Sequence, residues 1–313
     1  MNISKFESYF GKNHSIYTSS PEWKFITLIS GGYTDEAVSL FGNERDYGNG
    51  PLKIDTPYGE FNGPEEIKQM AEGWRSFLQA ESIIPSAVSQ TRGGGRSVTE
   101  IVLHYTTSDG EEHAVPMAAV ADLKHDDMMD ELRLYWNWHL IPGTPAYRPP
   151  VFPPREDLTC RHEMLSGAVR DYMVILHDPN GNIIERADKI FADRLCFGGY
   201  EHQDYEYVNL HDFIEPFQKG IGHTLSQRVH LRMETIIDDG RICCVEWEQL
   251  VTKLGREQYN RLSQAGISFY ELNEEGKIWS VRIIDYANTE KDIDWSTARR
   301  TKEEAEAINY IGK

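Results

Sequence analysis

The chain of 313 residues repeats part of itself, and this repeat restricts its fold more than any other feature. Two stretches have the residue alternation of a β-strand: "ELRLYWNW" at 131–138 and "WSVRIIDY" at 279–286. Each holds an arginine among apolar residues, Arg133 in the first and Arg282 in the second. The two arginines are 149 positions apart, a little under half of the chain. If the stretches are copies, the chain is a duplication and the arginine belongs to each copy.

Further matches between the two halves keep the same order and a nearly constant offset. They pair 116–136 with 265–285, 93–112 with 238–257, 35–47 with 185–197, and 63–78 with 209–221. The second match sets Glu100 beside Glu246. Each unit is predicted to contain helix, helix, short strand, helix and then three long antiparallel strands. The predicted fold class is therefore α+β, with helices against one face of a curved antiparallel sheet.

A proline-rich segment separates the halves. "IPGTPAYRPPVFPPRED" has prolines at 142, 145, 149, 150, 153 and 154. Proline fixes φ and donates no hydrogen bond, so this segment fits neither a helix nor a central strand. We predict a first domain at 1–141, a linker at 142–158 and a second domain at 159–295. Residues 296–313 are predicted to form a charged tail helix.

Composition excludes several classes of partner. The net charge of −18 disfavours nucleic acid and anionic membrane surfaces. The sequence has no apolar window long enough to span a membrane, and its first residues lack the apolar core of a signal peptide. The four cysteines are few, and two of them are adjacent. These features predict a reduced, cytoplasmic protein.

Three motifs resemble the nuclear transport factor 2-like superfamily. They are "TPYGEFNGPEEIKQM" at 56–70, "SFYELNEEGKIWSVRIIDY" at 268–286, and an "ELR-x-Y" strand followed by "RPP" at 148–150. Within the superfamily, the SnoaL-like polyketide cyclase group is the most similar type. The resemblance implies two cone-shaped α+β barrels in tandem, each with a pocket between sheet and helices. It also implies that the two barrels pair as an internal pseudo-dimer, and a further homodimer is a second expectation.

The resemblance implies proton-transfer chemistry on a small hydrophobic molecule that contains oxygen. Such chemistry needs a base and a donor that stabilises developing negative charge. Alternation places Glu100 and His104 on one face of their strand, and Arg133 and Tyr135 on one face of the closing strand. One hypothesis puts all four around a single cavity. Glu100 or His104 would then be the base, and Arg133 and Tyr135 would hold the substrate oxygen.

Other residues extend the predicted site. Asp46 is a third catalytic candidate, and it precedes a turn-forming Gly-Asn-Gly segment. The remaining candidates are predicted to bind substrate: Tyr47, Tyr58, Trp136, Glu246 and Arg282. No metal ligand set is predicted, because "HEM" at 162–164 lacks a second histidine four residues on. No organic cofactor is expected either, since the sequence contains no phosphate-binding or dinucleotide-binding motif.

Two alternatives stay open. Glu100 and Arg133 could form a cross-strand ion pair that is purely structural, and its recurrence as Glu246 and Arg282 suits that interpretation. The protein as a whole is predicted to be a cofactor-independent enzyme that catalyses cyclisation, isomerisation, dehydration or hydrolysis. The alternative is a non-catalytic protein of the same fold that binds a small molecule or serves as a scaffold.

Overall fold

The computed structural model describes residues 19–42, 52–124, 128–137, 140–141, 151–152, 164–177, 181–198, 206–226, 229–252 and 259–285. The chain divides into two compact units, Met1–Arg148 and Pro149–Lys313. This division falls inside the proline-rich segment. Asp46, Tyr47 and the expected tail helix at 296–313 lie outside the described residues. Within the described part, no helix is long and apolar enough to cross a membrane.

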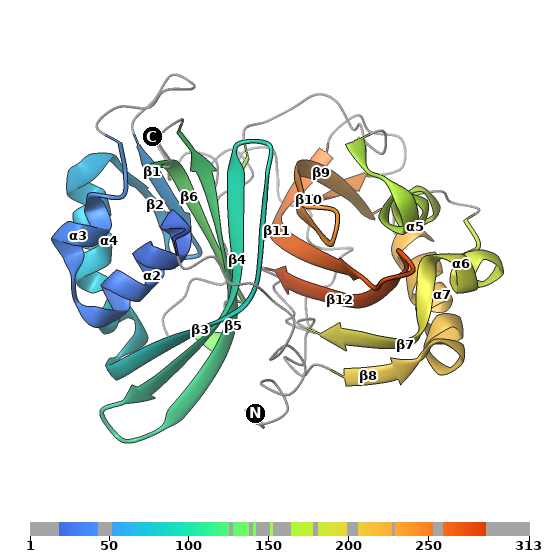
Figure 1. The fold of residues 1–313 in the computed structure, drawn as a ribbon, viewed down its shortest axis with the longest axis horizontal. Helices are drawn as coiled ribbons and strands as arrows, with labels where there is room; N and C mark the ends of the chain where they lie inside the picture. Colours follow the sequence, from blue (N-terminus) through green and yellow to red (C-terminus); the bar gives the residue numbers. More distant parts are fainter. Residues whose placement is uncertain are drawn as a thin grey trace. The chain divides into compact units, whose positions relative to one another are not determined.

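Unit 1 places three helices on one side of a six-stranded sheet (Figure 1). The helices are α2 (Pro21–Gly31), α3 (Thr34–Val38) and α4 (Gly63–Leu78). The strands are β1 (Lys53–Thr56), β2 (Gly59–Asn62), β3 (Ala80–Gly93), β4 (Arg96–Thr107), β5 (Glu112–Leu123) and β6 (Met129–Trp136). Their order in the sheet is β2-β1-β6-β5-β4-β3, and only the β1–β6 pair of this sheet is parallel.

Local sequence explains the helix boundaries. Pro21 occupies the first turn of α2, where its missing N–H costs nothing. The helix ends at Gly32, whose φ of 83° lets its N–H reach the carbonyl groups of the last turn. The buried residues of α4 recur at helical spacing and face the sheet; they are Ile67, Met70, Ala71, Trp74 and Leu78.

Unit 2 repeats the arrangement, with α5 and α7 on one side of its sheet (Figure 1). Its helices are α5 (Gly167–His177), the short 3-10 helix η3 (Ile184–Arg186), α6 (Ala187–Ile190) and α7 (Leu210–Ser226). Its strands are β7 (Phe191–Gly198), β8 (Glu206–Asn209), β9 (Val229–Asp238), β10 (Ile242–Thr252), β11 (Tyr259–Leu272) and β12 (Ile278–Asp285). The order is β8-β7-β12-β11-β10-β9, again with one parallel pair, β7–β12. Two α+β units in tandem, as predicted, are confirmed.

The strand register reproduces the predicted equivalences. Glu100 on β4 lies opposite Ala118 on β5, and Glu246 on β10 lies opposite Ile267 on β11. Ala118 and Ile267 are 149 positions apart, the same offset as the two arginines. Glu100 and Glu246 therefore occupy the same place in their sheets, and so do the arginines of β6 and β12.

Two expectations about the sheet were wrong. Each sheet is mixed, because β1 and β7 run parallel to their neighbours β6 and β12. Each unit also has four long strands after its third helix, since β3 and β9 were not predicted. In unit 1 the missed strand contains Pro85, which ordinarily argues against a strand. β3 is the edge strand, where a missing N–H is tolerated.

Candidate functional site

The sheet of each unit has two distinct faces. We call the side covered by the unit's own helices the helix face and the opposite side the outer face. Leu103 on β4 and Leu134 on β6 belong to the core under the helices. Because neighbouring residues on a strand point to opposite faces, Glu100 on β4 and Arg133 on β6 lie on the outer face. The predicted alternation of both strands is thus present in the structure.

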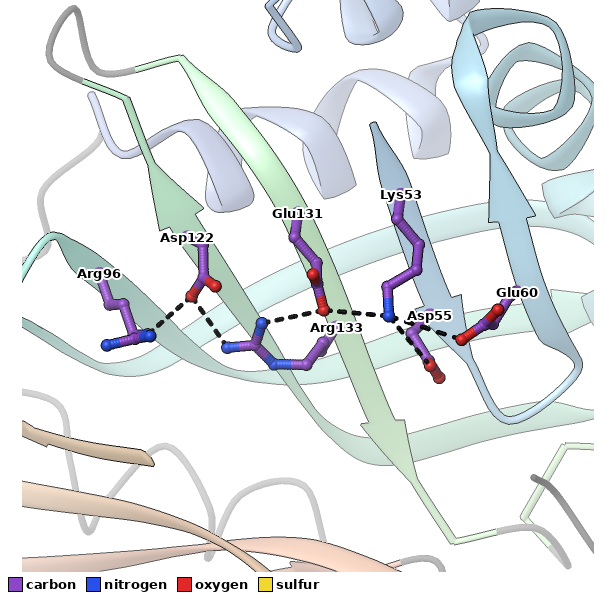
Figure 2. Close-up of polar contacts among 7 residues, drawn as sticks. All are labelled: Lys53, Asp55, Glu60, Arg96, Asp122, Glu131 and Arg133. Atoms are coloured by element: carbon purple, nitrogen blue, oxygen red, sulfur yellow. Dashed lines mark hydrogen bonds and ion pairs between the residues drawn. The ribbon is translucent and has the colours of Figure 1, made fainter. Parts of the chain in front are cut away.

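A row of alternating charges crosses the outer face (Figure 2). We call it the charge ladder, and its members are Lys53, Asp55, Glu60, Arg96, Asp122, Glu131 and Arg133. Asp122 accepts from Arg96 Nε at 2.7 Å and from Arg133 Nη2 at 3.0 Å. Arg133 Nη1 also donates to Glu131 at 3.2 Å. Lys53 continues the ladder to β1 and β2, with its Nζ 3.3 Å from Glu131 and 3.5 Å from Glu60.

The ladder determines the electrostatics of Asp122. Burial by itself would raise the pKa of this carboxyl. The guanidinium groups of Arg133 and Arg96 outweigh the burial and hold the pKa at about 2. Asp122 is therefore ionised at neutral pH, and it bridges the two arginines across β4, β5 and β6.

Unit 2 contains the matching arginine contact. Arg282 on β12 donates to Glu271 at 3.0 Å and to Ser280 at 2.8 Å. Glu271 and Ser280 stand 149 positions after Asp122 and Glu131. The contact between the closing-strand arginine and an acid on the preceding strand is therefore present in both units.

The sequence left open a cross-strand ion pair between Glu100 and Arg133. β5 lies between β4 and β6, so the two residues are not neighbours across one pair of strands. Arg133 is instead held by the charge ladder, while fully buried Glu100 accepts a hydrogen bond from Ser89 at 2.7 Å. Tyr135 shares the row of Glu100, with Ala118 between them. His104 is half-buried, four residues further along β4, opposite Ala114.

The helix face of unit 1 carries a different set of residues. We define the aromatic cluster as Tyr58, Trp74, Phe77, Tyr105 and Trp136, which belong to one core. The Tyr105 ring stacks on His113, with ring centres 4.7 Å apart. The Tyr58 ring lies 4.8 Å from Phe77 and 5.7 Å from Trp136, and the rings of Trp74 and Trp136 are 6.1 Å apart. The Tyr58 hydroxyl donates to the carbonyl oxygen of Phe77 at 3.3 Å.

Two buried donors in this cluster lack hydrogen-bond partners. Neither the indole Nε1 of Trp74 nor the hydroxyl of Tyr105 finds one among the described residues. Both residues are buried in the core, at 0% and 2% exposure. Burial, with a smaller contribution from Tyr58, raises the pKa of Tyr105 to about 12, so its hydroxyl stays protonated. Native structures rarely leave such groups unsatisfied, and a bound molecule or a water commonly accounts for them.

A second polar group lies on the same face. We define the Glu22 cluster as Ser20, Glu22, Gln90, Ser97 and Thr99. Glu22 on α2 accepts hydrogen bonds from Ser97 at 2.5 Å and from Thr99 at 2.8 Å. The Gln90 amide donates to Thr99 and to Ser20, both at 2.9 Å. Burial raises the pKa of Glu22, against the opposing effect of these hydroxyl groups.

In the described part of unit 2, two buried donors of the helix face have partners. Trp247 Nε1 donates to the hydroxyl of Ser268 at 2.9 Å, and a hydrogen bond also joins Ser268 to Tyr270. Burial raises the pKa of Tyr270. The rings of Tyr172 and Tyr270 lie 5.7 Å apart, so aromatic residues fill this interior too. Unlike Trp74, the buried indole of this unit has a partner.

The structure thus divides the predicted site. Tyr58 and Trp136 meet in the aromatic cluster on the helix face. The remaining described candidates of unit 1 are on the outer face: Glu100, His104, Arg133 and Tyr135. Glu246 and Arg282 belong to unit 2. A single cavity cannot be lined by residues from both faces of one sheet.

Sequence reasoning missed three residues of the helix face. Tyr105 lies on the face opposite Glu100, as alternation along the strand predicts, and its spacing is that of a core residue. Trp74 falls at a core position in the helical spacing of α4, so the sequence gives no sign that its indole N–H matters. Glu22 stands in the first turn of α2, where acidic residues are common for local reasons. Nothing in the sequence pattern separates these three from ordinary helix and core positions.

Comparisons with known proteins show likeness in fold. Neither protein-family models nor curated proteins match the chain. Three solved structures are similar over roughly one unit each. An NTF2-like protein from Exiguobacterium sp. 255-15 is 15% identical, with a TM-score of 0.31, over 38% of this chain and 98% of its own.

The other two solved structures have comparable coverage. The epoxide hydrolase/cyclase-like enzyme SalBIII of salinomycin pyran-ring formation is 11% identical, with a TM-score of 0.32, over 45% of this chain and 96% of its own. A protein of ketosteroid isomerase-like fold from Catenulispora acidiphila DSM 44928, in complex with trimethylamine, is 15% identical, with a TM-score of 0.32, over 39% and 91%. Unit by unit, the chain is similar to the NTF2-like and ketosteroid isomerase-like α+β fold, and it carries a six-stranded sheet with helices twice in tandem.

Proposed function

We propose that unit 1 binds a small hydrophobic molecule containing oxygen at its aromatic cluster, and that it performs cofactor-independent acid–base chemistry on this molecule. One observation supports the proposal above all. Two buried donors, the Tyr105 hydroxyl and the Trp74 indole N–H, have no partner in the described part of the chain. A bound oxygen atom is the acceptor that they lack.

The energetics favour such a ligand. A buried donor without a partner costs about 1–3 kcal/mol, and this cost is recovered when an acceptor arrives. The surrounding rings of Tyr58, Phe77 and Trp136 offer apolar contact to a hydrophobic body. Uncharged donors in a buried site also stabilise negative charge that develops on the oxygen.

Acid–base chemistry on this molecule needs a titratable group on the helix face. Glu100 and His104 project from the outer face, so the sheet separates them from anything held by Tyr105 and Trp74. The reaction classes stay those expected from the sequence, namely cyclisation, isomerisation, dehydration or hydrolysis. Each of them moves a proton near an oxygen-bearing carbon.

A second candidate function is binding without catalysis. It is favoured by the position of Glu100 and His104, because the two residues predicted as bases lie across the sheet from the donors. Under this alternative, unit 1 would hold its ligand and leave it unchanged. The two functions differ in one measurable property, the exchange of protons on the bound molecule.

Binding is tested with 6-propionyl-2-(dimethylamino)naphthalene, a neutral naphthyl ketone whose fluorescence reports apolar, hydrogen-bonding surroundings. Titration should give saturable binding to the wild-type protein. Tyr105→Phe and Trp74→Phe should each raise the Kd about tenfold, the effect of losing one hydrogen bond. Tyr135→Phe is the matched control, because it removes a hydroxyl from the outer face and should leave the Kd unchanged. Equal affinities in all four proteins would contradict the proposal.

Catalysis is tested with the same ketone in D2O. Mass spectrometry follows deuterium entering the carbon next to the carbonyl group. Faster incorporation with the wild-type protein than in buffer, together with loss of the effect in Tyr105→Phe, supports an enzyme. Saturable binding without accelerated incorporation supports the non-catalytic alternative.

A further inference from the structure

Tyr105, one of the two buried donors, has a histidine as its neighbour on the helix face. It lies opposite Ile83 on β3 and opposite His113 on β5. Side chains directly opposite each other on antiparallel strands project from the same face and interact. The rings of Tyr105 and His113 are stacked, with centres 4.7 Å apart and an angle of 16° between their planes. The stack therefore brings a side chain that can become positively charged against the Tyr105 ring.

The two stacked residues differ in their exposure to solvent. Tyr105 is 2% exposed, whereas the His113 side chain is 30% exposed. Tyr105 keeps its own proton, because burial raises its pKa to about 12. His113 exchanges a proton with water. The stack thus joins the interior of the aromatic cluster to a group that responds to the pH of the solvent.

Two acidic residues of the turn between β4 and β5 interact with His113. Glu111 Oε2 lies 3.7 Å from His113 Nε2. The pKa of Asp109 is lowered mainly by a hydrogen bond from Thr107, and attraction to His113 is a smaller cause. In the described part of the chain, Glu111 and Asp109 are the charged residues that interact with His113. Both belong to an exposed turn, so they attract a protonated ring but leave the Tyr105 hydroxyl without an acceptor.

A positive charge on His113 favours a negatively charged oxygen at the Tyr105 hydroxyl. A protonated imidazole ring over a phenol ring draws electron density from it, which makes the phenol O–H a stronger donor. The charge also attracts an anion directly, and a partly buried site screens this attraction less than open water does. Hydrogen bonds to an ionised acceptor are about twice as strong as those between neutral groups.

The number of donors fits a carboxylate as well. This group offers two acceptor oxygens. Two donors of the cluster, the Tyr105 hydroxyl and the Trp74 indole N–H, have no partner among the described residues. A buried carboxylate needs hydrogen bonds and a positive charge nearby, and the two donors together with His113 supply both.

We infer that unit 1 takes a hydrophobic carboxylate, and that protonated His113 sets this preference. The inference rests on the proposed function, which it deepens by naming the charge and chemical class of the ligand. The rings of the aromatic cluster hold the apolar body, and Tyr105 and Trp74 donate to the carboxylate. His113 is a specificity-determining residue, since it acts on the ligand through the Tyr105 hydroxyl and through its own charge.

The test compares two fluorescent ligands of similar shape. 6-Propionyl-2-(dimethylamino)naphthalene carries a neutral ketone, and 6-(dimethylamino)-2-naphthoate carries a carboxylate at the equivalent ring position. Histidine side chains change charge between about pH 5 and 8, whereas the naphthoate stays mostly ionised over this range. Lowering the pH from 8 to 5.5 should lower the Kd of the naphthoate for the wild-type protein about tenfold. The Kd of the ketone should change by less than about threefold.

Variants of His113 separate its charge from its stacking. His113→Phe keeps a ring on Tyr105 but cannot be protonated, so the Kd of the naphthoate should no longer fall at low pH. His113→Gln removes both the ring and the charge, and it should lose the pH dependence in the same way. His104→Gln is the matched control, because it removes a histidine from the outer face of β4 and should keep the pH dependence. Circular dichroism and urea unfolding check the fold of each variant.

The outcomes separate the inference from the proposed function. If Tyr105→Phe and Trp74→Phe bind the ketone as tightly as wild type, the proposed function is wrong. If they bind the ketone weakly but wild type binds the naphthoate no more tightly at pH 5.5 than at pH 8, only the preference for a carboxylate is overturned. A pH dependence that persists in both His113→Phe and His113→Gln overturns the role of His113 and leaves the binding proposal standing.

Discussion

The outer faces of the two units carry the same contacts, whereas their helix faces differ. Arg133 and Arg282 each hold an acid on the preceding strand, and Glu100 and Glu246 are buried in equivalent places. On the helix face, unit 1 has two donors without described partners and a buried carboxyl group. In unit 2 the buried indole of Trp247 on β10 has a partner, and apolar Val245 stands where unit 1 has Thr99. A feature present in both units serves the scaffold, whereas one present in a single unit is free to serve a function.

The largest predicted effect concerns the shared arginine contact. Arg282→Met should destabilise the protein by about 3–5 kcal/mol, because it removes the guanidinium that donates to buried Glu271 and Ser280. Arg133→Met should cost about 2 kcal/mol, because Asp122 keeps Arg96 and Glu131 keeps Lys53. Urea unfolding measures both free energies.

Pairing the variants sharpens this test. Adding Glu271→Gln to Arg282→Met should restore part of the lost stability, since the buried negative charge that faced Arg282 is then removed. Equal losses of unfolding free energy in Arg282→Met and Arg133→Met would contradict the difference in ion-pair partners between the two arginines.

The next effect depends on pH and belongs to unit 1 alone. The pKa of Asp122 is lowered from 3.8 to about 2 in the folded protein. Folding therefore favours the ionised carboxylate, and this contribution is complete above about pH 4 and is lost as the pH falls towards 2. Its size is about 2 kcal/mol. The difference in unfolding free energy between wild type and Asp122→Asn should thus be large at pH 6 and small at pH 2.5. An unchanged difference across this range would show that the arginines do not hold Asp122 ionised.

The smallest effect compares the two buried indoles. Trp247→Phe and Trp74→Phe remove the same part of a ring, but only Trp247 loses a described hydrogen bond. Trp247→Phe should therefore be more destabilising by about 1 kcal/mol. Urea unfolding without ligand gives both values. Equal losses would indicate that the Trp74 N–H is satisfied after all, which would weaken the proposed ligand site.

Much of the scaffold could be predicted from the sequence. The constant offset between the halves predicted two units and placed Glu100 with Glu246, and the strand register bears this out. The strands β3 and β9 were not predicted, and β3 contains Pro85, a residue that ordinarily argues against a strand. Proline is tolerated in β3 because this strand lies at the edge of the sheet, and no local sequence pattern reveals that position.

The candidate site was less predictable for a physical reason. Alternation along a strand is a local property, so the sequence is enough to establish which residues share a face and that the arginine recurs. Which strands become neighbours, and which face the helices cover, depends on contacts between distant segments. These contacts place β5 between the strands of Glu100 and Arg133, and they let Arg133 donate to Asp122. They also let Glu22 accept hydrogen bonds from Ser97 and Thr99, which are 75 and 77 residues away in the sequence.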